Sequence, residues 1–99
     1  MNKLSPQETK LIGKWHFDGK EISADKTCER IKWLVKNELD EVAVSKQYGA
    51  WETLFRDRHD GRYWERTYPQ GEMQGGGPPA LECISEDVAR KKYGIGSEQ

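Results

Sequence analysis

The chain has 99 residues, a length that fits one domain, because two domains would each have too little chain to bury a stable core. Its basic and acidic residues nearly balance, with a formal net charge of −1 and a pI near 6.1. This balance argues against a protein that holds duplex DNA by neutralising phosphates. Hydrophobic residues make up 34% of the chain and include four Trp, so we expect a small core rich in large rings.

The sequence contains neither a signal-peptide-like apolar run in MNKLSPQETK nor the roughly 20 apolar residues of a membrane span. We therefore expect a soluble protein in the cytoplasm. Cys28 and Cys83 should then be reduced and buried. Because there is no CxxC pair, we do not expect these cysteines to form a metal site with His16 and His59, and no cofactor is implied.

The N-terminal part predicts a short helix followed by a hairpin. Ser5-Pro6-Gln7-Glu8 has the pattern of a capping box, which predicts a helix to about Leu11 that Gly13 ends. Residues 14–22 then alternate around Asp18-Gly19, a pair that tolerates the positive φ of a tight turn. This pattern predicts a β-hairpin.

The next segment predicts the longest helix, over residues 25–41. Its apolar residues recur at steps of three and four, which places them on one helical stripe. They are Cys28, Ile31, Leu34, Val35, Leu39 and Val42. Trp33 lies near the edge of this stripe, and we expect it to pack beside the core. The pattern breaks from Gln47 to Ala50.

Two strands are expected over residues 51–58 and 62–68, joined around His59-Asp60-Gly61. The turn is either the two residues Asp60-Gly61 or a four-residue loop that ends with Gly61 in the left-handed conformation. The two registers put the same side chains on each face. The predicted core face carries Trp51, Thr53, Phe55, Asp57, Trp64, Arg66 and Tyr68. The other face, expected to meet water or a partner, carries Glu52, Leu54, Arg56, Arg58, Tyr63, Glu65 and Thr67.

The stretch YPQGEMQGGGPPAL, residues 68–81, is rich in glycine and proline. A phosphate-binding loop is disfavoured, because Pro78 and Pro79 remove two N–H donors and prevent a helix from starting there. A slack linker is disfavoured too, because the prolines stiffen the exit. Two interpretations remain open: a shaped functional loop, or a plain crossing from one strand to a distant neighbour.

The C-terminal part predicts a strand over 80–84 and a helix that starts at Ser85 and ends at Gly94. Residues 1–4 and 95–99 are expected to fray. Together these elements predict a small single α+β domain over residues 1–99, with a mainly antiparallel sheet packed against one long helix and short helices at both ends. The strand order is not given by this pattern.

Catalytic residues are not expected, since no Ser, Cys or His has a context that suggests activation. A second possibility is a small RNA-binding module that uses Arg56, Arg58 and Tyr63 on the outer face of the central hairpin. Glu52 and Glu65 share that face and would repel phosphate.

Four segments together carry a resemblance to a known family. They are LSPQETKLIGKW, ERIKWL, WETLFRDRHDGRYWERTYPQGEMQGGGPPAL and ISEDVARKKYG, and they span Leu4 to Gly94. The chain resembles immunity protein family 27 of bacterial polymorphic toxin systems. The resemblance implies a non-enzymatic protein that binds a cognate toxin domain, expected to be a nuclease, and so protects the producing cell and its siblings in contact-dependent growth inhibition.

The toxin-binding residues are predicted from physical reasoning, because the resemblance transfers none. Acidic and polar groups near the hairpin and the glycine loop could meet the Lys and Arg that a nuclease uses to hold phosphate, with a Tyr as anchor. The predicted contacts are Asp57, Asp60, Tyr63, Glu65, Gln70, Glu72 and Gln74, and the loop is shaped by Gly75, Gly76, Gly77, Pro78 and Pro79.

Overall fold

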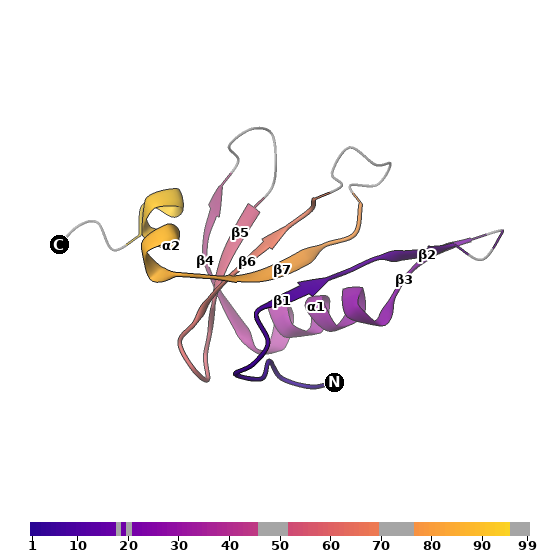
Figure 1. Cartoon of the computed structure of the whole chain (residues 1–99), viewed down its shortest axis with the longest axis horizontal. Coiled ribbons are helices and arrows are strands. Elements are labelled where there is room, and N and C mark those ends of the chain that lie inside the picture. The colour runs from indigo at the N-terminus through magenta and orange to yellow at the C-terminus, as the bar shows by residue number, and fades with distance from the viewer. Residues whose placement is uncertain (18, 20, 46–51, 70–76, 96–99) are drawn as a thin grey trace.

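The computed structural model describes residues 1–17, 19, 21–45, 52–69 and 77–95 (Figure 1). Within these ranges, five strands form one antiparallel sheet in the order β1-β7-β6-β5-β4. They are β1 (Lys10–Ile12), β4 (Leu39–Ser45), β5 (Glu52–Asp57), β6 (Tyr63–Thr67) and β7 (Ala80–Ile84). A separate hairpin pairs β2 (Trp15–Phe17) with β3 (Ile22–Ala24), and the helices are α1 (Lys26–Asn37) and α2 (Glu86–Tyr93). The predicted α+β class is confirmed.

Helix α1 packs on one face of the sheet and buries the core against it. The buried cluster consists of Ile31, Leu34, Leu39, Phe55, Trp64 and Leu81. Trp33 packs against this cluster as predicted. The β2–β3 hairpin extends from the sheet beyond the start of α1, at the right of Figure 1. Neither helix of the described chain is long and apolar enough to cross a membrane.

The predicted N-terminal helix is wrong, although its capping contact forms. The Ser5 N–H donates to the Glu8 carboxylate at 2.9 Å, but only a single turn follows. The next residues instead pair with β7, with Leu11 opposite Leu81. The predicted hairpin is confirmed in β2 and β3, and Gly19 has a φ of 97°.

The predicted helix over 25–41 is too long, since α1 has 12 residues and β4 follows at once. Asp25 caps its start by accepting the Cys28 N–H at 2.8 Å. A β-bulge between Glu41 and Ala43 explains the error. Val42 is the extra residue, so the sequence of β4 does not alternate, and the three-residue step from Leu39 to Val42 imitates a helical stripe.

The two central strands are confirmed as β5 and β6, and the turn between them is the four-residue alternative. Arg56 pairs with Tyr63, and Gly61 has a φ of 78°. Trp51 and the break at 47–50 lie outside the described residues, as do positions 96–99 of the expected C-terminal tail.

Part of the outer face of the central hairpin is covered. This face was predicted to be open to water or a partner, and the prediction is wrong for two of its residues. Leu54 is fully buried and Glu65 is 8% exposed. Helix α2 lies over them, where Tyr93 donates its hydroxyl to Glu65 at 2.8 Å. The helix itself is confirmed, with Ser85 capping its start and Gly94 in the left-handed conformation at its end.

Candidate functional site

Two hollows lie near opposite ends of β6. The first, of about 430 Å³, lies beside the β5–β6 turn, and we call it the turn groove. Its lining includes Arg56, Gly61, Arg62, Tyr63, Ile84 and Glu86. The second, of about 240 Å³, lies between the β2–β3 hairpin, α1 and the end of β6, and we call it the Arg66 pocket. Its lining includes Trp15, Cys28, Lys32, Arg66, Tyr68 and Pro79.

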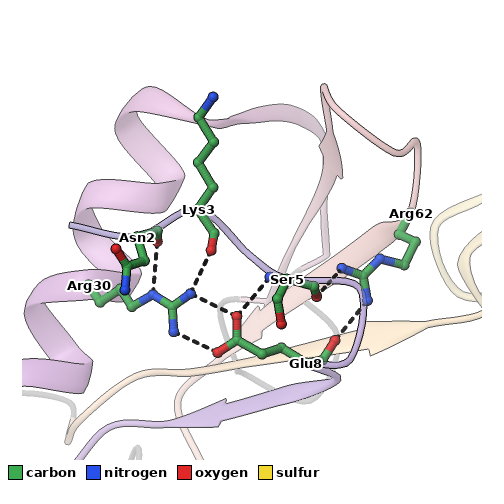
Figure 2. A network of polar contacts seen from close by, with 6 residues as sticks. All are labelled: Asn2, Lys3, Ser5, Glu8, Arg30 and Arg62. Atoms are coloured by element: carbon green, nitrogen blue, oxygen red, sulfur yellow. Dashed lines mark hydrogen bonds and ion pairs between the residues drawn. The ribbon is translucent and has the colours of Figure 1, made fainter.

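Arg62 in the turn groove is held by several internal contacts. Its guanidinium donates to the backbone oxygens of Glu8 at 2.7 Å and Ser5 at 3.0 Å (Figure 2), and to the Asp60 carboxylate at 2.6 Å. It also lies over the Trp64 ring at 4.9 Å. Burial alone would raise the pKa of Asp60, but the hydrogen bonds from Arg62 outweigh burial and lower it.

A second arginine, Arg30 on α1, binds the same N-terminal segment. We call the contacts of Arg30 and Arg62 with residues 2–8 the clamp. Arg30 binds the Glu8 carboxylate through two bonds of 2.7 and 2.8 Å, and also donates to the backbone oxygens of Asn2 and Lys3 (Figure 2). The hydrogen bonds from Arg30 hold the pKa of Glu8 at about 2, below its ordinary 4.5. Residues 2–8 are therefore tied to both α1 and the β5–β6 turn.

The remaining charged groups at the turn groove also have internal partners. Arg56 lies over the Tyr63 ring at 5.5 Å and donates to the Gly61 backbone oxygen at 3.3 Å. Glu86 accepts a bond of 2.7 Å from Arg90. The charges of the turn groove thus stabilise the fold, and Tyr63 is its half-buried aromatic ring.

The four predicted contact residues that the structure describes lie in different surroundings. Asp57 is 4% exposed and accepts the His59 N–H at 2.8 Å, which shapes the turn. Glu65 is held under α2, where Lys92 lies 2.6 Å from it. Asp60 and Tyr63 lie at the turn end of the hairpin, and the glycine loop leaves β6 at the other end. Gln70, Glu72, Gln74, Gly75 and Gly76 lie outside the described residues.

The connection between β6 and β7 is much longer than the strands require. These strands are antiparallel neighbours with Thr67 opposite Ala80, so the alternative of a crossing to a distant strand is wrong. Hairpins of this kind need only about two to five connecting residues. Residues 68–79 therefore contain surplus chain, which is typical of functional loops.

The described end of this loop is fixed against the hairpin and α1. Gly77, with a φ of 73°, and Pro78 are buried. The Pro79 backbone oxygen accepts the Gly13 N–H at 2.8 Å. A side chain at Gly13 would lie 2.5 Å from the Cys28 Sγ and 2.7 Å from this same oxygen. The loop thus returns to β7 along the wall of the Arg66 pocket.

The Arg66 pocket combines two basic side chains with aromatic walls. The Arg66 guanidinium lies 5.4 Å from the Phe55 ring and 5.6 Å from the Tyr68 ring, and donates to the Thr53 hydroxyl at 3.2 Å. Its Nε is buried and has no hydrogen-bond partner among the described residues. Burial raises the pKa of the Cys28 thiol, so this neighbour stays neutral and supplies no negative charge.

Sequence reasoning did not select Arg66, Lys32 or Trp15 as site residues. One signal was available, because Arg66 alternates with Trp64 and Tyr68 on the predicted core face. A charged residue on such a face needs a partner or a function. Trp15 and Lys32 come from distant segments, and only the fold brings them to the same hollow.

The arrangement is suited to binding. Within the ranges the structure describes, no three His, Cys, Asp or Glu side chains gather where they could hold a metal ion. The Arg66 pocket provides cations, stacking surfaces and a neighbouring loop, which are the groups that recognise another protein.

Comparison with protein families gives one finding. The family model described as Immunity protein 27 matches residues 17–85, a segment that includes most of the described strands, α1 and the glycine loop. Searches of curated proteins and of solved structures gave no match.

Proposed function

Because the chain belongs to the Immunity protein 27 family, we propose that it protects the cell that makes it by binding a cognate toxin domain and blocking its activity. The protein acts in the cytoplasm as a stoichiometric inhibitor without catalysis, and the toxin domain is a nuclease. The family match over residues 17–85 is the observation that carries this proposal.

The glycine loop and the Arg66 pocket form the centre of the proposed interface. Tyr68 at one end of the loop and Gly77 and Pro79 at the other all line this pocket, so loop and pocket are continuous. Gln70, Glu72 and Gln74 are proposed to contact the toxin from the loop. A standard interface engages about 800 Å² of each partner, which is enough to include both features.

Toxin contacts near the β5–β6 turn are a separate prediction from those of the glycine loop. Tyr63 lines the turn groove and Asp60 is bonded to Arg62, which also lines it, so both would add contact area if the toxin reaches that far. Asp57 and Glu65 are buried and bonded internally. Substituting these two residues would change folding as well as binding, so they are poor probes of the interface.

The test uses the protein and the toxin domain encoded beside it, co-expressed and purified by a tag on one partner. We expect a 1:1 complex free of nucleic acid by titration calorimetry and absorbance, and growth of toxin-expressing cells only when the immunity protein is present. Glu72→Lys should weaken binding by about tenfold or more, whereas Glu41→Lys, on the exposed edge strand β4, should change it little.

Failure of the wild-type protein to bind or protect would contradict the proposed function. If the wild type binds and Glu72→Lys binds equally well, the loop is outside the interface while the function stands. Release of RNA by salt, with no toxin bound, would instead favour the nucleic-acid alternative.

A further inference from the structure

Arg66 differs from the other arginines in that it is partly buried and has no acidic partner among the described residues. Four of them have a carboxylate partner within 2.6 to 2.8 Å; these are Arg30, Arg58, Arg62 and Arg90. Arg56 is exposed to solvent, where water can solvate its charge. Arg66 is partly buried, yet no acidic side chain of the described chain pairs with it.

The orientation of Arg66 is already fixed in the free protein. Contacts with Phe55, Tyr68 and Thr53 hold the guanidinium plane. A guanidinium held in this way has lost side-chain freedom before any partner arrives, so binding does not have to order it. The group is therefore preorganised to receive a planar, negatively charged acceptor.

The surroundings of Arg66 favour an anion. Lys32 on α1 adds a second positive charge to the rim, and no described residue forms an ion pair with it. Trp15, Tyr68 and Pro79 provide largely apolar walls. In such a setting a charge-assisted hydrogen bond is stronger than on an open surface.

From these observations we propose that the Arg66 pocket receives an Asp or Glu side chain of the toxin domain, with Arg66 as its hydrogen-bonding partner and Lys32 as a second cation. This assignment rests on the proposed function and adds the chemistry of the partner's central contact. A pocket of about 240 Å³ has the scale of one inserted side chain. The aromatic rim matches the composition of energetically dominant interface centres.

The first experiment measures toxin affinity for two charge variants and a matched control. Arg66→Gln should raise Kd by about 30-fold or more, because it leaves the partner's carboxylate buried without its cation. Lys32→Glu, at an exposed helix position that cannot unfold the core, should raise Kd by about tenfold. Lys91→Glu makes the same charge change on α2, across the sheet, and should alter Kd by less than about twofold.

The second experiment identifies the carboxylate. Each Asp and Glu of the toxin domain is changed to its amide, and the affinity of each variant is measured with wild-type protein and with Arg66→Gln. One amide variant should bind the wild type as weakly as Arg66→Gln binds wild-type toxin. The same variant should cause almost no further loss with Arg66→Gln, because the two groups act as one pair.

Two results would overturn the assignment. In the first, Lys32→Glu and a folded Arg66→Gln both bind the toxin like the wild type. In the second, Glu72→Gln lowers the thermal stability of the free wild type but not of Arg66→Gln, which would show that Arg66 has an internal partner. Loss of binding by the wild type itself would instead count against the proposed function.

Discussion

Gly13 occupies a position where the absence of a side chain decides the local packing. It lies between β1 and β2, against the Cys28 thiol and the Pro79 backbone oxygen. Its own N–H donates to that oxygen, and Pro79 lines the Arg66 pocket. A larger residue would push the loop return away from α1, since the Pro79 oxygen belongs to the backbone and cannot rotate away.

We expect Gly13→Ala to lower the free energy of unfolding by about 2 kcal/mol, the range typical of overpacking. Urea denaturation followed by tryptophan fluorescence would measure this change. Ser23→Ala, at an exposed position of the neighbouring hairpin, serves as the control and should stay within about 0.5 kcal/mol of the wild type. Equal stability of Gly13→Ala and wild type would show that the close approach is not required.

Among the elements, α2 is held to the sheet by charge as well as by apolar packing. Lys92 lies 2.8 Å from Glu52 and 2.6 Å from Glu65, and Tyr93 donates to the same Glu65 oxygen. Burial alone would lower the pKa of Lys92, but its bonds to the two glutamates outweigh burial and raise it. The ammonium thus stays charged, and its positive charge offsets the repulsion between the two neighbouring carboxylates.

Lys92→Met should destabilise the protein by about 2 kcal/mol, because it leaves the buried Glu65 and the nearby Glu52 without their shared cation. Lys91→Met makes the same substitution at the preceding position, which forms no ion pair with a described residue, and should change stability by less than about 0.5 kcal/mol. Thermal unfolding of both variants at neutral pH provides the measurement. A similar loss in the two would indicate that helix propensity, and not the Glu pair, is responsible.

The elements that the sequence predicts well are those whose signals are local. Alternation and turn residues give β5, β6 and β7, and a capping Ser with a terminal Gly gives α2. The errors occur where distant contacts decide. Glu8 has the local signal of a helix, but Arg30 and the pairing of β1 with β7 impose a turn and a strand.

The candidate site likewise has a part with a local sequence signal and a part that depends on contacts between distant segments. The glycine loop is visible in the sequence because its composition is unusual. The Arg66 pocket is not, since its lining comes from four segments that approach one another only in the fold. Glu65 shows the converse: its strand face is predicted correctly, but the covering of that face by α2 depends on tertiary packing.

At the scale of the whole molecule, the clamp around residues 2–8 joins parts of the chain that are far apart in sequence. Arg30 belongs to α1 and Arg62 to the end of the β5–β6 turn, and both hold the same N-terminal segment (Figure 2). Leu4, between these contacts, packs on the core cluster. The segment therefore links helix, turn and core, although the sequence predicted that its first residues would fray.

The Glu8 carboxylate should make the protein sensitive to acid. Its pKa is about 2 in the fold and 4.5 ordinarily, so its contribution is fully present above pH 4.5 and is lost as the pH falls towards 2. Glu8→Gln should cost about 2 kcal/mol at pH 7 and progressively less below pH 4.5. Chemical denaturation across this pH range measures the difference from the wild type.

The control for this measurement is Glu82→Gln. Glu82 lies 4.0 Å from Lys10 in a pair whose side chains are both about half exposed, and such pairs contribute less than about 1 kcal/mol. Its effect should be small at every pH. A Glu8→Gln penalty that stays constant down to pH 2.5 would show that lost packing, and not the lost charge, is the cause.

The bulge in β4 has a consequence for the protein before it meets any partner. In the described part of the chain, β4 is one of the two outer strands of the sheet, and Val42 and Val44 are exposed on it. A regular, apolar edge of this kind would offer a template for strands of other copies, which leads to aggregation. The register shift between Glu41 and Ala43 makes this edge irregular. The same irregularity that misleads helix prediction thus discourages self-association.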